Sequence, residues 1–238
     1  MDLGSVDKPT QLTNPMIIID IPTEQTTAVT DVFLAMMALI VSIIVYHIGH
    51  LRDMKKALIW TWAFSLLAVA AIFGAAAHGF QMTERTNFIL WQPINFSLGL
   101  TVALFAAGVV YDLKGFALPR VIIPAFIATG FVFYFITLLF PGAFIVFILY
   151  EAVAMLFALV AYLALSFRKK HCGYDLMAIG IFISIVAAGI QATNSIRFKL
   201  VWEFDHNGIF HLVQMIGLIF LLLGLRSGFL THSVTKRF

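Results

Sequence analysis

The sequence is poor in charged residues and in cysteine. Only 11% of its 238 residues are charged, whereas 61% are hydrophobic. A soluble domain carries about 25% charged residues, so this chain has too few of them to cover a surface that faces water. Its single cysteine, Cys172, excludes a framework of internal disulfides.

Several motifs of known chemistry are absent as well. The chain has no GxSxG nucleophile elbow, no Walker phosphate loop and no CxxCH haem-attachment motif. The apolar run over 206–230 contains no lysine, which argues against a retinal Schiff base. The first 15 residues are polar and lack an apolar core, so we expect no cleavable signal peptide.

What the chain does contain is seven long apolar runs. A helix needs about 20 apolar residues to cross a bilayer, and backbone groups in lipid must be hydrogen-bonded within their own segment. We therefore predict an all-α polytopic membrane protein with seven transmembrane helices. Its parts are an N-terminal extracytoplasmic segment over 1–25, a helix bundle over 26–230 and a cytoplasmic tail over 231–238. The predicted helices are 26–50, 57–80, 87–112, 117–140, 142–167, 174–198 and 206–230.

The basic residues are distributed unevenly between the two ends of the predicted bundle. The end that includes the C-terminus holds 11 of them: Arg52, Lys55, Lys56, Lys114, Arg120, Arg168, Lys169, Lys170, Arg226, Lys236 and Arg237. The other end holds 4: Lys8, Arg85, Arg197 and Lys199. Loops rich in Lys and Arg stay in the cytoplasm, so we predict the N-terminus outside and the C-terminus inside. Basic residues placed beside spans indicate topology signals, and we expect no nucleic-acid partner.

Polar residues gather at the predicted outer end. Because successive helices run in opposite directions, Asp31, His78, His206 and His211 come to one membrane face, with Asp31 near the start of the first helix. His206 lies about 140° around the helix from His211. Further polar residues expected around this pocket are Gln92, Gln191, Asn194, Asn207 and Gln214.

This cluster has three interpretations. His78, His206 and His211 could bind a divalent ion, most simply zinc, whose bound water becomes a nucleophile near neutral pH. Asp31, Glu24, Glu84 or Asp205 would then orient that water or move protons. The alternatives are a hydrogen-bonded cluster that only fixes the packing of three helices, and a haem with histidine ligands.

Glu151 is an isolated acid inside the fifth predicted helix. It lies about 9–14 Å from the start of that helix, where a charge costs about 2.5–3.5 kcal/mol on the insertion scale. We expect it to be protonated or hydrogen-bonded inside the bundle, and a role in proton transfer remains open.

The layout of the chain resembles the CREST superfamily, which includes alkaline ceramidases, Per1-type proteins and progestin/adiponectin receptors. The resemblance is carried by Asp31 at the first helix, His78 at the end of the second, and the pair His206 and His211 at the seventh. It implies seven helices and a zinc ion held by these three histidines. The chain looks closer still to a bacterial family with Thr30-Asp31, His78-Gly79-Phe80 and His206 to Gln214 motifs, which implies a bacterial inner membrane.

Three functions follow as hypotheses, and the third, a small transporter or receptor, rests on Glu151 alone. The first is a metal-dependent membrane hydrolase that acts on a lipid amide or ester, with membrane lipids as its partners. The second is a non-catalytic subunit of a larger membrane complex, which binds partner helices, lipid or a pigment.

Overall fold

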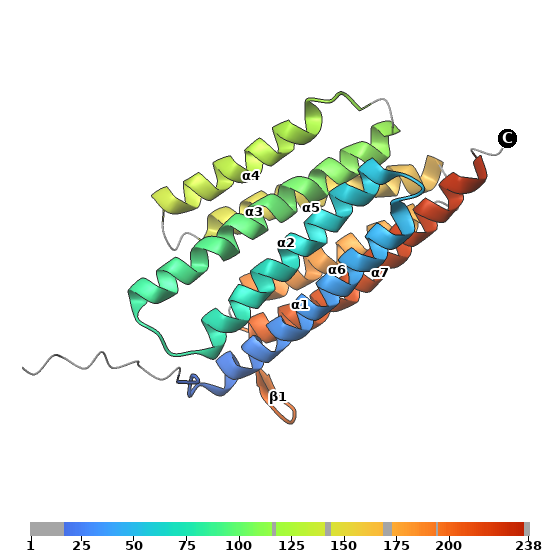
Figure 1. Cartoon of the computed structure of the whole chain (residues 1–238). Helices are drawn as coiled ribbons and strands as arrows, with labels where there is room; N and C mark the ends of the chain where they lie inside the picture. The colour runs from blue at the N-terminus through green and yellow to red at the C-terminus, as the bar shows by residue number, and fades with distance from the viewer. Residues whose placement is uncertain (1–16, 116–117, 141–143, 169–172, 194, 236–238) are drawn as a thin grey trace, which may run out of the picture.

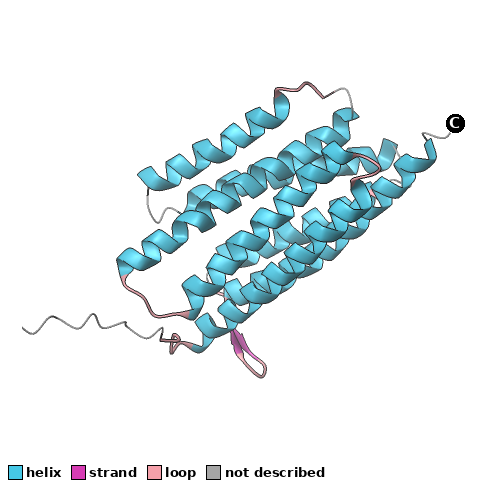
Figure 2. Cartoon of the chain, viewed as in Figure 1, coloured by secondary structure: helices cyan, strands magenta, loops and turns pink. Residues whose placement is uncertain are grey.

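The computed structural model describes residues 17–115, 118–140, 144–168, 173–193 and 195–235. These residues form an antiparallel bundle of long helices with one short hairpin (Figure 1, Figure 2). The elements are α1 (Pro22–Gly49), α2 (Met54–Gly79), α3 (Glu84–Lys114), α4 (Ile122–Leu139), α5 (Phe144–Arg168), α6 (Tyr174–Ala192), β1 (Phe198–Lys199), β2 (Glu203–Phe204) and α7 (His206–Thr235).

Seven of these helices are long and apolar enough to cross a membrane, which confirms the predicted number of spans. The largest difference is at the sixth helix, predicted over 174–198, because α6 ends at Ala192. Phe198 and Lys199 instead pair with Phe204 and Glu203 in an antiparallel hairpin. Apolar residues in this hairpin extend the hydrophobic run, and hydropathy alone does not separate them from the helix.

The helices pack in an order that follows the chain only in part. α1 lies against α2 and α7, α2 against α3, and α6 against both α5 and α7. α4 lies at the edge of the bundle (Figure 1) and packs mainly on α3. Its buried residues are Gly130 and Phe133, and the Phe133 ring stacks on Tyr150 of α5 at 4.7 Å between centroids. α4 is therefore the least embedded helix of the fold.

Small residues allow α6 and α7 to approach closely. A Cβ atom added at Gly180 would stand 2.9 Å from the carbonyl oxygen of Gly217. A Cβ atom at Gly217 would stand 2.9 Å from the Ser184 hydroxyl. Close packing of this kind drives helix association in lipid, where the hydrophobic effect does not hold helices together. It fixes α7 against the rest of the bundle.

A backbone clasp joins the segment before α1 to the end of α2. The Ile19 N–H donates to the Gly79 carbonyl at 3.0 Å, and the Gln81 N–H donates to the Ile17 carbonyl at 2.8 Å. Ile18 and Phe80 form the bridge between these bonds. The clasp holds the start of α1 beside the end of α2.

A buried ionic network lies near the start of α2. The Lys56 ammonium contacts the Asp112 carboxylate of α3 at 2.6 Å, and the side chains are only 7% and 4% exposed. The Tyr162 hydroxyl donates to Asp112 at 2.7 Å. Asp53 caps α2 by accepting from the Lys56 N–H at 3.1 Å. Lys56 thus belongs to the interior of the bundle, although the sequence groups it with the basic loops.

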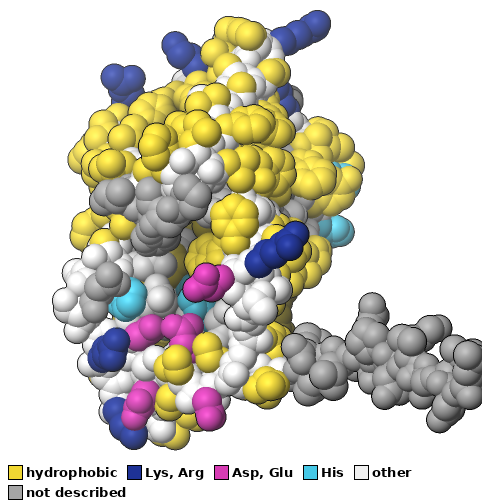
Figure 3. All heavy atoms as spheres, turned by 90° about the vertical axis from the view of Figure 1, so that its left-hand side faces the viewer, with side chains coloured by type: hydrophobic (Ala, Val, Ile, Leu, Met, Phe, Trp, Pro, Cys, Tyr) yellow, Lys and Arg dark blue, Asp and Glu magenta, His cyan; other side chains and the backbone are white. Residues whose placement is uncertain are grey.

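Exposed side chains on the bundle are largely apolar. Leu39, Phe135 and Val153 are 49%, 58% and 71% exposed. Figure 3 shows a broad hydrophobic belt, with acidic and histidine side chains gathered below it. A surface of this kind suits lipid, and the protein is an integral membrane protein.

Candidate functional site

Asp31 and Thr30 lie inside the bundle. α1 begins at Pro22, so Asp31 stands about 14 Å along the helix from that residue. Both side chains are buried. The position of Asp31 therefore differs from the predicted start of the first helix, because the helix extends through Thr26 and Thr27 up to Pro22.

Asp31 meets His211 of α7. Their Oδ1 and Nε2 atoms are 3.3 Å apart, and both side chains are less than a tenth exposed. The other ring nitrogen, Nδ1, lies 3.0 Å from the Thr30 hydroxyl. Both nitrogens of His211 therefore face side chains of α1.

The Thr30 hydroxyl determines where the protons of this pair lie. Its single proton is donated to the Thr27 carbonyl at 2.9 Å, so its oxygen must accept from Nδ1–H of His211. The contact between Nε2 and Asp31 then needs one shared proton, carried either by the ring or by the carboxyl group. In both cases Asp31 and His211 together have no net charge, and they can exchange that proton with a third group.

A second imidazole–carboxylate pair lies towards the end of the bundle. Nδ1 of His78 is 2.6 Å from Oε2 of Glu24, and these side chains are 18% and 30% exposed. Among the described residues, Nε2 of His78 has no hydrogen bond. The ring lies edge-on to Trp91 at 6.1 Å and within electrostatic range of Asp31 and Asp205. The two pairs therefore belong to one polar region.

Gly74 on α2 leaves room for the Asp31 carboxylate. A Cβ atom at Gly74 would stand 2.9 Å from Oδ2 of Asp31. The absence of a side chain at Gly74 therefore lets the carboxylate lie directly against α2.

Asp205 orients the start of α7. Its Oδ1 atom accepts from the backbone N–H groups of Asn207 and Gly208, each at 3.0 Å. The same atom accepts from the Thr27 hydroxyl at 3.0 Å. This is a helix cap that also ties α7 to α1. A carboxylate one residue before the helix is the sequence signal for such a cap.

The other predicted site residues lie in several places. His206 is the first residue of α7, and its Nδ1 atom is buried without a partner among the described residues. Gln191 donates to Asn207 at 3.2 Å, and Gln92 donates to the Phe88 carbonyl at 2.9 Å. Glu84 is exposed in the first turn of α3. Asn194 lies outside the described residues.

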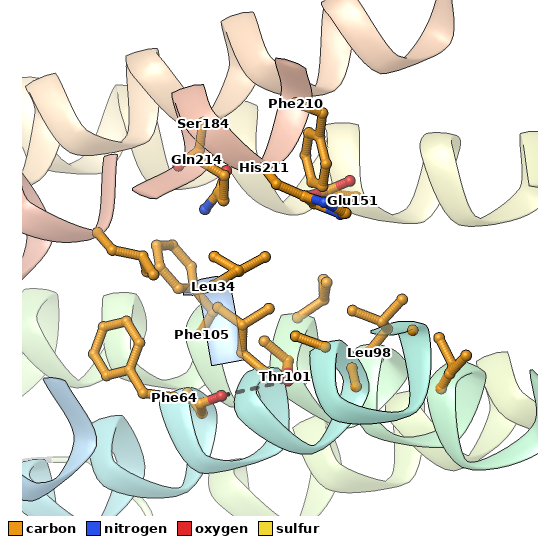
Figure 4. Close-up of a pocket in the computed structure, with 18 of the residues that line it drawn as sticks. Leu34, Phe64, Leu98, Thr101, Phe105, Glu151, Ser184, Phe210, His211 and Gln214 are labelled. Carbon is orange, nitrogen blue, oxygen red and sulfur yellow. Dashed lines mark hydrogen bonds between the residues drawn. The ribbon is translucent and has the colours of Figure 1, made fainter. Parts of the chain in front are cut away.

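A cavity of about 130 Å³ opens beside the Asp31–His211 pair. Its walls come from every helix except α4, and they are mostly apolar. In Figure 4, Ser184, Phe210, His211, Gln214 and Glu151 line one wall, opposite Leu98, Thr101, Phe64 and Phe105. The cavity therefore joins an acid–base pair to space suited to an apolar group.

The described residues contain no group of three or more His, Cys, Asp or Glu side chains placed to hold a metal ion. Zinc on His211 would displace either Thr30 or Asp31 from a ring nitrogen. In this arrangement the histidines do not fit a shared zinc site. The zinc and haem ligands stay predictions.

Comparison with known proteins adds one relationship. Neither a curated protein nor a solved structure matches the chain, and the resemblance to the CREST superfamily stays a prediction. A family of unknown function, DUF6962, matches residues 26–228, a range that includes Asp31, His78 and His211. The chain therefore belongs to the DUF6962 family.

Proposed function

We propose that the protein is a membrane hydrolase that cleaves an amide or ester bond of a lipid. The observation that carries the proposal is that Oδ1 of Asp31 and Nε2 of His211 lie 3.3 Å apart and that both residues line an apolar cavity. An amphipathic molecule would place its apolar part among the aromatic side chains and its polar bond beside the pair.

The pair can supply general acid–base catalysis. As water attacks the carbonyl carbon, its proton passes to the Asp31–His211 pair. The pair then returns a proton to the leaving nitrogen or oxygen as the bond breaks. Thr30 keeps the imidazole in the required orientation through its contact with Nδ1. The proposed reaction needs only these side chains and one water molecule.

The proposed orientation places this reaction at the outer side of a bacterial inner membrane. The distribution of 11 basic residues against 4 supports the N-terminus outside and the C-terminus in the cytoplasm. Glu24 and His78 then lie towards the outer face, and the substrate reaches the cavity from the lipid or from that face.

The test uses purified protein in lipid nanodiscs with a panel of lipid amides and esters. Released fatty acid is measured by mass spectrometry. We expect turnover by the wild type and a loss of about 100-fold or more in Asp31→Asn and His211→Gln, the range expected for a lost acid–base group. Asp175→Asn, the same acid-to-amide change at an exposed site in the first turn of α6, is the matched control and should keep full activity. Absence of hydrolysis across the panel would contradict the proposal.

The second candidate is a non-catalytic subunit of a membrane complex. It is favoured by α4, which packs mainly on α3 and leaves most of its surface uncovered. A partner helix could cover that surface. Crosslinking in native membranes through a photoreactive residue at Phe135, which is 58% exposed, would then give one discrete product. Crosslinks to lipid alone would reject this candidate.

A further inference from the structure

We infer that the cavity selects a ligand with a cationic amine attached to an apolar body. This inference rests on the proposed use of the cavity as the binding site and names the class of molecule bound there. It is carried by the charges that line the cavity, by an unpartnered acid on its wall and by its aromatic lining.

The charges on the cavity wall do not balance. Asp31 and Glu151 are its acids, His211 is its base, and no Lys or Arg occurs among the described residues that line it. Because Asp31 and His211 share one proton, that pair contributes no net charge. Glu151 is then the acid that has no basic side chain in the lining, and a cationic ligand would supply the counter-charge that favours its ionised form.

Glu151 is also without a partner inside the protein. Among the described residues, its carboxyl group takes part in no hydrogen bond or ion pair, although it lines the cavity at about 10 Å from the start of α5. Gln214, on the same wall in Figure 4, likewise has no hydrogen bond within the described residues. A half-buried acid and a half-buried amide with unused acceptors provide hydrogen-bond sites for an ammonium group.

The rest of the lining suits the body of such a ligand. Phe64, Trp91, Phe105, Phe147 and Phe210 contribute aromatic rings, whose faces attract cations as well as apolar groups. The volume of about 130 Å³ is close to the roughly 150 Å³ of an engineered cavity that binds benzene. The enclosed part of the ligand is therefore about one ring or a short alkyl segment.

The experiment compares three probes of one shape: 4-phenylbutylamine, 4-phenylbutanol and 4-phenylbutyrate. Binding to the full chain in nanodiscs is measured by calorimetry, with empty nanodiscs subtracted. We expect the amine to bind wild type at least tenfold more tightly than the alcohol, and the carboxylate to bind most weakly. Equal affinity for amine and alcohol in the wild type would overturn the inference without any variant.

Variants locate the origin of the preference. Glu151→Gln should bring the ratio of amine to alcohol affinity close to one, whereas Glu151→Asp, which keeps the charge, should retain part of it. Asp175→Asn, the same acid-to-amide change at an exposed site, should leave the ratio unchanged. A ratio that survives Glu151→Gln would overturn the assignment to Glu151.

The two proposals fail separately. Amine selectivity without lipid hydrolysis would retain the ligand class and reject the hydrolase. Lipid hydrolysis without amine selectivity would do the reverse.

Discussion

Removing the Lys56 ammonium should destabilise the protein far more than removing a lysine from the surface. The informative change is Lys56→Met, because methionine keeps the apolar stem that lies among buried side chains. The ammonium contacts Asp112 at 2.6 Å, and the two side chains are 7% and 4% exposed. After the substitution, Asp112 keeps only the Tyr162 hydroxyl at 2.7 Å and becomes a buried acid without a cation.

The expected magnitude follows from burial. Breaking a buried ion pair by removing one partner costs about 3–5 kcal/mol. The pair between Lys199 and Glu203 has a similar distance, 2.8 Å, but its side chains are 70% and 43% exposed. Solvent-exposed pairs contribute about 0–1 kcal/mol. Lys56→Met should therefore cost at least about 2 kcal/mol more than Lys199→Met.

Unfolding in mixed micelles by titration with sodium dodecyl sulfate gives the required free energies. Trp60, which is fully buried in the core, supplies a fluorescence signal for loss of packing. The double variant Lys56→Met/Asp112→Leu should recover much of the lost stability, since it removes the orphaned acid as well. If Lys56→Met costs no more than Lys199→Met, Asp112 is solvated and the network does not act as described.

Four further outcomes are expected. Gly74→Ala should lower lipid hydrolysis about tenfold or more without unfolding the protein, because its methyl group would stand 2.9 Å from Oδ2 of Asp31 and displace that carboxylate. Thr30→Val should lower the free energy of unfolding by about 1–3 kcal/mol, since it removes the hydroxyl that lies 3.0 Å from Nδ1 of His211; Thr30→Ser should retain it. If the predicted zinc is bound, elemental analysis of the wild type should find it in stoichiometric amount, and His211→Ala should remove it. A metal content at background in the wild type would refute the zinc prediction. A reporter fused after Phe238 should be active only in the cytoplasm, and activity on the outer face would reverse the topology.

Hydrophobic runs predicted the helices because lipid requires every span to be a continuous apolar segment that is long enough to cross the bilayer. Length and continuity of apolar residues satisfy this requirement, and they can be read locally. The error at α6 arises because Ile196 and Phe198 prolong the run beyond Ala192, and Phe198 belongs to the hairpin. Apolar side chains in an exposed turn carry no local mark that distinguishes them from those of a span.

The candidate site could be predicted only to the level of a shared membrane face. Alternating helix direction placed Asp31 and His211 at one end, and the structure brings them into contact. The pairing of Glu24 with His78 depends on α1 starting at Pro22, which the hydrophobic pattern does not indicate. Such pairs join residues far apart in the sequence, and they depend on the orientation of each helix about its own axis.

The buried network at Lys56 could not be predicted from the sequence either. Lys56 and Asp112 each lie beside a loop in the sequence, which is the usual place for solvated charges. Only the packing of α3 against α2 and α5 encloses them. The local sequence shows that these residues are charged, whereas their burial depends on which helices pack beside them.

The clasp between residues 17–19 and 79–81 has a consequence for biosynthesis. The hydrogen bond from Ile19 to the Gly79 carbonyl can form only after the ribosome has synthesised α2. The end of α2 must also have reached the membrane side on which Ile19 lies. Glu24 and His78 each lie within five residues of the clasp on their own segments. Their pairing is therefore a late event, which follows insertion of the first helical hairpin and cannot guide it.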